Sequence, residues 1–371
     1  MADAALPPAP PLRGVINRLA GSRRFQAFCA RMPGLRGLAR REGAALFDQM
    51  QGFVQSQVLM ALVELRVLHH LADSPMTAAA LAGQLGLPEP RAQVLLQAGA
   101  AMKLLKRRGA GFALARRGAA FLAVPGLDEM VRHHAVLYRD LSDPVAFFRG
   151  ETQPELAGFW PYVFGADGPM DPDVTARYSR LMADSQTLVA EEALPHLSLR
   201  GVTRLMDVGG GTGAFLRAVR ARHPGLELAL YDLPQVVDQA PLPADVIRHG
   251  GSFREGPLPQ GADAISLVRV LYDHSDETVR GLLARVFDAL PPGGRVLVIE
   301  PMSGGARPDP QTDVYFSVYT LAMKTGRTRS AAEIGDLLTV SGFENIRNQR
   351  VSRAFVTGIV EAQRSAQSSQ R

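Results

Sequence analysis

The sequence has very little cysteine and no long apolar run. Cys29 is the one cysteine among 371 residues, which excludes a disulfide within the chain and a thiolate cage for a metal, and is typical of a reducing compartment. No stretch approaches the ~18 consecutive apolar residues that a membrane-spanning helix needs. The opening MADAALPPAPPLRG also lacks the charged and then apolar segments of a secretory signal. We therefore expect a cytoplasmic protein.

Acidic residues are absent from residues 13–41, a segment that holds eight arginines. Apolar residues recur between these arginines at spacings that suit an amphipathic helix. They are Val15, Ile16, Leu19, Phe25, Phe28, Met32, Leu35 and Leu38. This helix could pack on its own domain with a solvated arginine face, or it could lie on an anionic membrane surface as a peripheral contact. We assign residues 1–43 to a basic amphipathic N-terminal arm.

The composition indicates a folded protein with two domains. Hydrophobic residues make up 46% of the chain and charged residues 21%, so each part can bury a core rather than stay disordered. The chain of 371 residues is also longer than the ~250–300 residues at which a single core stops growing.

Residues 44–125 have the pattern of a winged helix. Apolar residues recur at helical spacing over residues 44–71, and two short helices, TAAALAGQLGL and EPRAQVLLQAGAAMKLL, follow with Pro88 between them. KLLKRRGAGFAL then predicts a β-hairpin. A winged helix can bind DNA. The second helix here is mostly Ala, Leu, Val and Gln, however, which suits packing better than contacts with phosphates. We expect no nucleic-acid partner.

The rest of the chain predicts a helical connector followed by an α/β domain. Helical patterns cover residues 127–148 and 171–194, and the aromatic stretch between them is either a linker or a pocket wall, so residues 126–200 form the connector. Within residues 201–361, β-rich runs alternate with helical segments. Strands are expected at 204–208, 227–231, 245–248, 262–271 and 295–300.

The fold class is therefore α/β, with a doubly wound sheet after a mainly α winged-helix domain. The last two runs, 343–351 and 353–362, leave no room for a helix and predict an antiparallel final strand. Residues 362–371 are polar and are expected to be a disordered tail.

The stretch RLMDVGGGTGAFLRAV leads from a predicted strand through glycines into a helix. Glycines at 209, 211 and 213 let the backbone turn sharply and approach a ligand closely, because no Cβ obstructs it. Asp232 ends the next strand, where a carboxylate can accept hydrogen bonds from ribose hydroxyls. Gly209-x-Gly211-x-x-Ala214 also fits the relaxed dinucleotide fingerprint. Asp207, Gly213 and the final hairpin favour S-adenosylmethionine and methyl transfer over hydride transfer.

From residue 44 to residue 360 the chain resembles the S-adenosylmethionine-dependent O-methyltransferases with a winged-helix dimerisation domain, a group that includes plant caffeate enzymes and acetylserotonin enzymes. The motifs that carry the resemblance are DVGGGTG, YDLP, the RHGGSF turn, GADAISLVRVLYDHSDE, LPPGGRVLVIEPM and SAAEIGDLLTVSGF. The resemblance implies a class I methyltransferase domain, S-adenosylmethionine as donor with S-adenosylhomocysteine as product, and a homodimer formed through the N-terminal domain.

Within the group, three features look most like the demethylspheroidene O-methyltransferases of bacterial carotenoid synthesis. They are VRVLYDHSDETV, the stretch EPMSGGARPDPQTDVYFSVYTLAMKTGRTRS and the basic arm. This likeness implies a hydrophobic acceptor, with the tertiary hydroxyl of an acyclic carotenoid as the best candidate. A phenolic, indolic or carbon acceptor, and a DNA-binding regulator that only senses a ligand, remain as alternatives.

The resemblance also implies roles for particular residues. Gly209 and Gly211 match the glycines under the amino-acid moiety of the donor, and Asp232 matches the ribose ligand. Ser252 stands where the family usually has an aspartate beside the adenine, while Phe253 still covers the ring. The expected cofactor-side residues are Asp207, Gly209, Gly211, Gly213, Asp232, Leu233, Ser252, Phe253 and Arg269, and the expected pocket residues on the long helix are Tyr178 and Met182.

The stretch VRVLYDHSDE departs from the family pattern. Tyr272 stands where most members carry a general-base histidine, because the order here is Tyr-Asp-His instead of His-Asp-Trp. Glu300 keeps the first of the two family carboxylates, and Thr328 replaces the second. We hypothesise that Tyr272 positions the acceptor hydroxyl, His274 accepts its proton, and Asp273 orients either group. His274 could instead be a neighbour of the N-cap of the next helix.

Residues 312–323, TDVYFSVYTLAM, predict a helix with Tyr315, Tyr319 and Met323 on one face. Such a stripe is more often core, but it could line a pocket for a long apolar acceptor. No cluster of His, Cys, Asp or Glu has metal-ligand spacing, so we expect metal-independent catalysis.

Overall fold

The computed structural model describes residues 11–159 and 185–365. The chain divides into two compact units, with the boundary between Ala120 and Phe121. This boundary lies inside α7 (Arg116–Leu122), a few residues before the expected one after residue 125.

The N-terminal arm is three helices rather than one. They are α1 (Pro11–Ala20), α2 (Arg23–Arg31) and α3 (Arg36–Glu64). Ser22 starts α2 by accepting a hydrogen bond from the Phe25 amide. Met32 ends it in an extended conformation, as expected for a residue that precedes a proline. The expected boundary after residue 43 is wrong, because α3 runs through it without interruption.

Apolar side chains of these helices are exposed. α2 buries none of its residues, and the exposed apolar residues continue along α3 as far as Val54. Phe53 is 72% exposed. The exposed set is Val15, Ile16, Leu19, Phe28, Met32, Leu38, Leu46, Phe47, Met50, Phe53 and Val54. In the described structure the apolar side chains of the arm therefore do not pack on the first unit. An exposed apolar surface of this extent is typical of an interaction site.

The winged-helix expectation for the first unit is confirmed. α4 (Val67–His70) is separated from α3 because Arg66 adopts a left-handed conformation, which corrects the single helix expected over residues 44–71. α5 (Ala78–Leu85) and α6 (Glu89–Ala101) form the helix pair. β1 (Leu105–Arg108) and β2 (Gly111–Leu114) form the antiparallel hairpin that follows.

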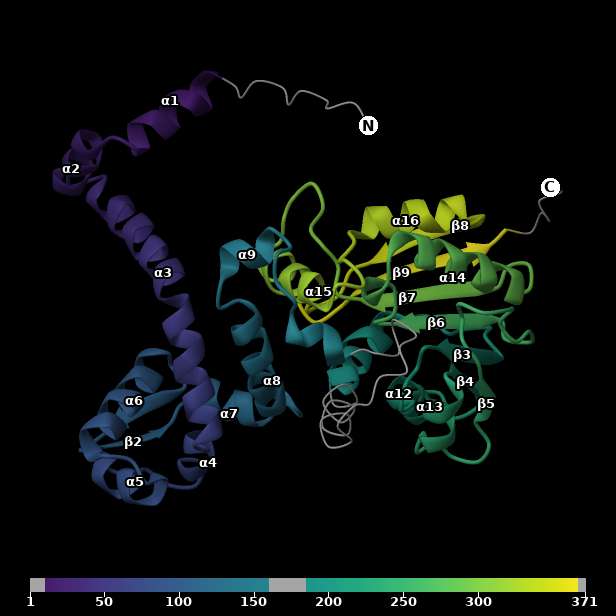
Figure 1. Cartoon of the computed structure of the whole chain (residues 1–371), viewed down its shortest axis with the longest axis horizontal. Coiled ribbons are helices and arrows are strands. Elements are labelled where there is room, and N and C mark those ends of the chain that lie inside the picture. Colours follow the sequence, from purple (N-terminus) through teal and green to yellow (C-terminus); the bar gives the residue numbers. More distant parts are fainter. Residues whose placement is uncertain (1–10, 160–184, 366–371) are drawn as a thin grey trace. The chain divides into compact units, whose positions relative to one another are not determined.

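The second unit is built on a seven-stranded sheet with the order β5-β4-β3-β6-β7-β9-β8. Five strands are parallel, and β9 runs antiparallel to both of its neighbours (Figure 1). The strands are β3 (Arg204–Val208), β4 (Glu227–Asp232), β5 (Ile247–Gly250), β6 (Ala264–Val268), β7 (Arg295–Glu300), β8 (Phe343–Gln349) and β9 (Gly358–Arg364). The expected doubly wound sheet with an antiparallel last strand is confirmed.

Several strand boundaries differ from the expectation, and β9 begins at Gly358 instead of residue 353. β5 lies two residues later than expected. β6 ends at Val268 because Arg269 has a φ of 57°, and the chain then forms a 3₁₀ turn, η3 (Leu271–Asp273). β9 continues to Arg364, since Ala362 and Gln363 pair with the first residues of β7, so the expected tail boundary at residue 362 is wrong.

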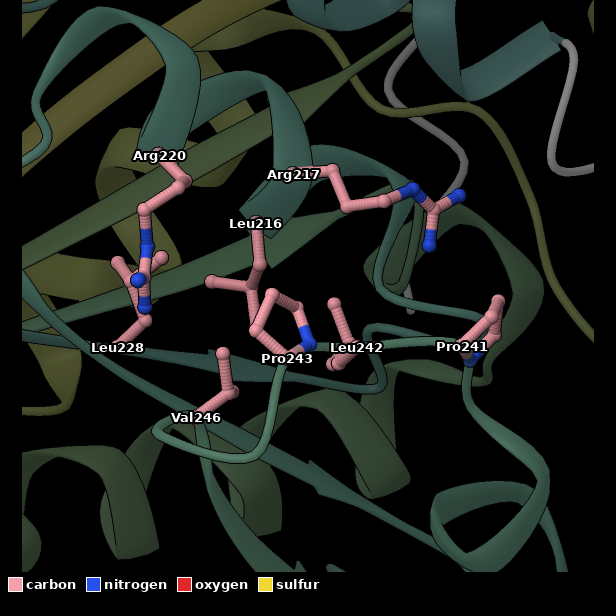
Figure 2. A pocket seen from close by; sticks show the side chains of 8 residues that line it. All are labelled: Leu216, Arg217, Arg220, Leu228, Pro241, Leu242, Pro243 and Val246. Atoms are coloured by element: carbon pink, nitrogen blue, oxygen red, sulfur yellow. The ribbon is translucent and has the colours of Figure 1, made fainter.

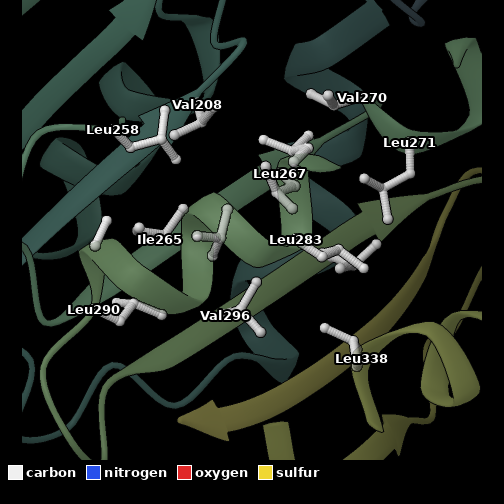
Figure 3. Packing of buried hydrophobic residues seen from close by; sticks show 14 of the residues in the cluster. Val208, Leu258, Ile265, Leu267, Val270, Leu271, Leu283, Leu290, Val296 and Leu338 are labelled. Carbon is white, nitrogen blue, oxygen red and sulfur yellow. The ribbon is translucent and has the colours of Figure 1, made fainter. Parts of the chain in front are cut away.

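Apolar residues fill both faces of this sheet. Successive side chains of β7 alternate between two clusters, with Val296 and Val298 on one face and Leu297 and Ile299 on the other. α14 (Asp276–Ala289) and α16 (Ala331–Val340) cover the first face, which Figure 3 shows in detail. α12 (Ala214–Arg222) and α13 (Pro234–Gln239) cover the second. Coverage of both faces explains why the strands read as continuous apolar runs.

Shorter elements build the wall beside the carboxyl ends of the strands. The helix expected over residues 127–148 is two helices, α8 (Leu127–Asp140) and α9 (Pro144–Phe148), because Asp143 caps a new start at a proline. A π-helical turn, η4 (Thr312–Phe316), precedes α15 (Ser317–Met323). The 3₁₀ turn η1 (Glu155–Phe159) completes this set. A second 3₁₀ turn, η2 (Leu194–His196), directly follows the helical residues 185–193. Residues 185–193 are helical, and the remainder of the helix expected from residue 171 lies outside the described residues.

Candidate active site

The glycine loop connects β3 to α12 and leaves space beside its backbone. Gly209, Gly211 and Gly213 all have positive φ, a conformation that side chains with a Cβ rarely adopt. A Cβ at Gly211 would meet no atom within 4 Å, whereas one at Gly213 would collide with Leu242. The loop is thus held against the domain at Gly213 and open at Gly211, as close approach of a ligand requires.

Asp232 ties this loop to the end of β4. One carboxylate oxygen accepts the Gly211 amide at 2.8 Å, and the other accepts the Leu233 amide at 2.7 Å. Burial raises the pKa of Asp232, and these two backbone hydrogen bonds act in the opposite direction. Each oxygen keeps a further lone pair, and the role of Asp232 as the ribose ligand stays a prediction.

Asp207 is fully buried at the end of β3 and retains unsatisfied hydrogen-bonding capacity. Its Oδ1 accepts the Ser266 hydroxyl at 2.6 Å, while its Oδ2 has no partner among the described residues. Burial raises the pKa of Asp207 to about 7. A Cβ at Gly210 would lie 2.5 Å from that free oxygen, so the carboxylate lies directly beneath the loop. A buried acceptor at this place suits the amino-acid moiety of a sulfonium nucleoside, and the residues present therefore fit this donor.

His274 lies with the residues expected to contact the adenine. Its ring packs edge-on against Phe253 with centroids 5.2 Å apart, and Arg254 Nη2 lies 3.2 Å from its Nδ1. Ser252 uses its hydroxyl to accept the Arg254 amide. Burial and two arginines lower the pKa of His274 to about 4. The structure thus brings His274 together with Phe253, which is expected on the cofactor side, and its role as base for the acceptor stays a prediction.

Replacing His274 by alanine should therefore weaken donor binding more than it slows catalysis. Loss of one aromatic contact of about 0.5–1.5 kcal/mol corresponds to a roughly 3- to 10-fold higher Kd for S-adenosylhomocysteine. Turnover at saturating donor should stay within about threefold of wild type. Calorimetry and steady-state rates measure the two quantities, with the exposed His69→Ala as the control. A large fall in kcat at unchanged Kd would restore the base role.

Tyr272 faces Arg269 at the carboxyl end of the sheet. Arg269 Nη2 donates to the Tyr272 hydroxyl at 3.2 Å, and Arg269 Nη1 donates to Ser185 at 2.7 Å. Glu300 accepts the Tyr272 amide at 3.1 Å, so it holds the backbone of the turn instead of orienting a basic side chain. Burial raises the pKa of Tyr272 above its ordinary value and that of Glu300 to about 7. A raised pKa means that Tyr272 keeps its proton at neutral pH, and its role in positioning the acceptor hydroxyl stays a prediction.

Asp273 is the remaining member of the Tyr-Asp-His set. It is buried, its pKa is raised well above the ordinary value by burial, and its Oδ1 has no partner among the described residues. Arg269 and Glu300 are the charged groups that act on it.

Arg329 is a site residue that the sequence reasoning missed. Its guanidinium is fully buried and donates to the carbonyl oxygens of Leu271 and His274 at 2.7 and 2.8 Å, and it pairs with Asp276. It therefore holds both ends of the η3 turn that carries Tyr272. Its neighbour Thr328, at the position of the missing carboxylate, shares a 2.6 Å hydrogen bond with Ser317.

α8 supplies two histidines that the sequence reasoning also missed. His133 Nε2 lies 2.8 Å from the Tyr319 hydroxyl, and His134 Nε2 lies 2.7 Å from the Tyr315 hydroxyl. The two tyrosine rings are stacked with centroids 6.0 Å apart, so they share one face of the helix as expected. Only their adjacency as a histidine pair beside a predicted pocket could have drawn attention to them.

Met323 lies in the apolar core beneath α15. It is fully buried in a cluster with Leu156 and Phe147, so the structure favours the core interpretation for this residue. Tyr178 and Met182 lie outside the described residues.

A surface pocket of about 310 Å³ lies behind the glycine loop, where α12 meets the chain before β5 (Figure 2). Its lining residues are Leu216, Arg217, Arg220, Leu228, Pro241, Leu242, Pro243 and Val246. Both arginines are engaged, Arg217 with the Thr212 carbonyl and Arg220 with Asp245. Among the described residues, the Arg220 Nε has no hydrogen-bond partner, so one donor of this guanidinium is uncommitted.

Within residues 11–159 and 185–365, no group of three or more His, Cys, Asp or Glu side chains is placed to hold a metal ion. The same part of the chain has no helix that is both long and apolar enough to cross a bilayer.

Comparison with known protein families identifies the family of this chain. A model of the O-methyltransferase domain matches residues 138–344, more than half of the chain, and a model of the O-methyltransferase dimerisation domain matches residues 47–123. This chain belongs to the O-methyltransferase family. The methyltransferase depends on S-adenosylmethionine, in keeping with the glycine loop and the carboxylates described above.

Relatives of the methyltransferase are similar over most of its length. It is 62% identical to a demethylspheroidene O-methyltransferase of Cereibacter sphaeroides over 96% of this chain and 97% of the relative. It is 33% identical to acetylserotonin O-methyltransferase of Mus musculus over 84% of this chain and 86% of that relative. A solved methyltransferase in calicheamicin biosynthesis, bound to S-adenosylhomocysteine, has a TM-score of 0.70 at 25% identity, over 88% of this chain and 98% of that one.

Proposed function

We propose that the methyltransferase transfers the methyl group of S-adenosylmethionine to the tertiary hydroxyl of an acyclic carotenoid such as demethylspheroidene. The observation that carries this proposal is the 62% identity over nearly the full length of both chains to the demethylspheroidene enzyme. A second relative of the same name, from Rhodobacter capsulatus, is 53% identical over 97% of this chain.

The residues beside the strand ends provide groups that suit an acceptor hydroxyl on an apolar molecule. The sulfonium supplies an electrophilic methyl group with a neutral leaving group, so most of the barrier reduction comes from holding the acceptor oxygen in line at ~3 Å. Tyr272 and Arg269 provide donors that can hold this oxygen, and the stacked rings of Tyr315 and Tyr319 provide an aromatic wall. A phenolic or indolic acceptor is the second candidate, favoured by the acetylserotonin relatives at 33% identity.

A methyl-transfer assay tests the acceptor. Donor carrying a labelled methyl group is incubated with the protein and, in separate reactions, a hydroxylated acyclic carotenoid in detergent micelles, N-acetylserotonin and a hydroxycinnamate. Label in the carotenoid product, with at least tenfold less in the others, is the expected result. Label in a phenol or indole alone would contradict the carotenoid proposal and leave the methyl-transfer chemistry in place.

We also propose that the N-terminal unit pairs with a second copy of the chain. The match to the dimerisation domain over residues 47–123 and the exposed apolar side chains of α3 support a homodimer. In a monomer, Leu46 and Phe53 expose apolar surface to water, and pairing of two N-terminal units can bury that surface. Sedimentation equilibrium should give twice the mass of 40.0 kDa.

The arginine-rich α1 and α2 are proposed to contact an anionic membrane surface, where a carotenoid acceptor would reside. Each arginine near such a surface contributes about 1 kcal/mol, so replacing Arg18, Arg23 and Arg24 by glutamine should lower binding to anionic vesicles roughly 100-fold. The matched control replaces the exposed Arg91, Arg108 and Arg116 of the same unit and should keep most of the binding. Equal losses in both variants, or no binding by wild type, would rule out the arm as a membrane contact.

A further inference from the structure

The methyltransferase carries Tyr272 where its family usually has a basic histidine, and the proton of an aliphatic acceptor still has to leave. Tyr272 is a donor beside the positively charged Arg269, and His274 faces Phe253 and Arg254. Asp273 and Glu300 are buried beneath the turn, where Glu300 holds the Tyr272 backbone. Tyr272 and Asp273 both interact with Tyr319 of α15, so the search for the proton acceptor extends to that helix.

The α15 wall contains a tyrosine that is paired with a neutral imidazole. His133 Nε2 lies 2.8 Å from the Tyr319 hydroxyl, and α15 packs against both α8 and the η3 turn that carries Tyr272. In the tautomer with its hydrogen on Nδ1, His133 accepts the Tyr319 proton through Nε2. Tyr319 interacts electrostatically with Tyr272, Arg269 and Asp273, so its hydroxyl belongs to the same cluster as the groups that would hold the acceptor.

We propose that Tyr319 and His133 form the route by which the proton of the acceptor hydroxyl leaves during methyl transfer. The acceptor oxygen forms a bond to the methyl carbon as the carbon–sulfur bond breaks, and the bonding electron pair stays on sulfur. The hydroxyl proton passes to Tyr319 Oη while the proton of Tyr319 passes to His133 Nε2. The positive charge of the sulfonium thus ends on the imidazolium of His133, which later loses its proton to solvent.

The protonation states of both groups suit this transfer. Burial and His134 lower the pKa of His133 to about 4, so its imidazole is neutral and able to accept a proton at neutral pH. Burial raises the pKa of Tyr319 well above its ordinary value, so a lasting tyrosinate is disfavoured, and the two proton movements belong to one step. An ether oxygen that still carries its proton is a strong acid, so an imidazole with a pKa of about 4 is basic enough to remove it.

The neighbouring pair offers an internal comparison. His134 and Tyr315 have the same kind of hydrogen bond at 2.7 Å. His134 follows His133 on α8, and Tyr315 lies in η4, one turn before Tyr319 of α15. The electrostatic neighbours that shift the Tyr315 pKa are Arg269 and Tyr138, whereas those of Tyr319 include Tyr272. Both tyrosines are therefore coupled to Arg269, and Tyr319 is the one that is also coupled to Tyr272 and Asp273.

The experiment uses the full chain and measures kcat, KM for the acceptor and the Kd of S-adenosylhomocysteine for His133→Gln, Tyr319→Phe and His134→Gln. His133→Gln keeps an oxygen that accepts from Tyr319 but cannot take a proton. We expect kcat to fall about 100-fold in the first two variants, in line with general-base catalysis, at unchanged donor Kd and melting temperature. His134→Gln should raise KM and keep kcat within about threefold.

The pH profile separates proton removal from a merely structural role. Wild-type kcat should be flat between pH 6 and 9 and fall only near pH 4–5, where His133 gains a proton. The titratable and charged groups around the Tyr319–His133 pair are His134, Tyr315, Tyr272, Asp273 and Arg269. In His133→Gln, kcat should rise with pH over the same range, because hydroxide replaces the lost base. This inference rests on the proposed function: absence of turnover by wild type would contradict that function, whereas wild-type turnover with unchanged kcat and pH profile in both variants would overturn the relay.

Discussion

Replacing Asp232 by alanine should raise the Kd for S-adenosylhomocysteine by about 100- to 10,000-fold. Hydrogen bonds to a charged acceptor contribute about 1.5–3 kcal/mol each, and this carboxylate is placed to receive two of them from the ribose. The substitution also frees the Gly211 and Leu233 amides that Asp232 now holds. Isothermal titration calorimetry measures the change directly.

The matched control for this variant is Asp238→Ala. Asp238 lies exposed on α13, in the same unit as Asp232. Its replacement by alanine removes the same charge at a position away from the glycine loop. Its Kd should stay within about twofold of wild type. Equal weakening by both variants would mean that net charge, and not a ribose contact, sets the affinity.

Replacing Arg329 by methionine should lower the free energy of unfolding by about 3–5 kcal/mol and abolish most turnover. The guanidinium is fully buried, and its removal leaves two backbone carbonyls without the charged donor that holds the η3 turn. Because η3 carries Tyr272, the geometry at the strand end is lost together with stability. Urea unfolding of the purified chain and acceptor turnover measure the two effects.

Arg327→Met provides the control for charge loss at the same place. Arg327 pairs with Asp276 and Glu333, but its side chain is 46% exposed. Exposed pairs of this kind contribute about 0–1 kcal/mol, so stability should hardly change. A loss as large as that of Arg329→Met would indicate that Asp276 pairing, rather than the buried carbonyl contacts, stabilises the turn.

The sequence predicted the sheet well because its strands are bounded sharply. β3 and β7 begin and end where expected, since each is an apolar run that starts at an arginine and ends at a glycine loop or a proline. The donor loop was also predictable, because glycines with positive φ leave a readable pattern. Local chemistry alone determines these features.

The features that the sequence did not reveal depend on contacts between distant segments. The orientation of the His274 side chain follows from the short η3 turn and from the hydrogen bond of Arg329 to the His274 carbonyl. Arg329 is distant from His274 in the sequence and lies in no distinctive local pattern. The pairing of His133 with Tyr319 joins residues 186 positions apart. The break at Arg66 requires a left-handed residue that helix propensity does not favour, so packing must impose it.

The most direct test of the central claim is calorimetric titration of the full chain with S-adenosylhomocysteine and, separately, with a reduced nicotinamide dinucleotide. Saturable heat with one S-adenosylhomocysteine per chain, and none with the dinucleotide, is the expected result. Heat with the dinucleotide and none with the spent methyl donor would contradict the assignment of the glycine loop and Asp232, and with it every chemical step described here.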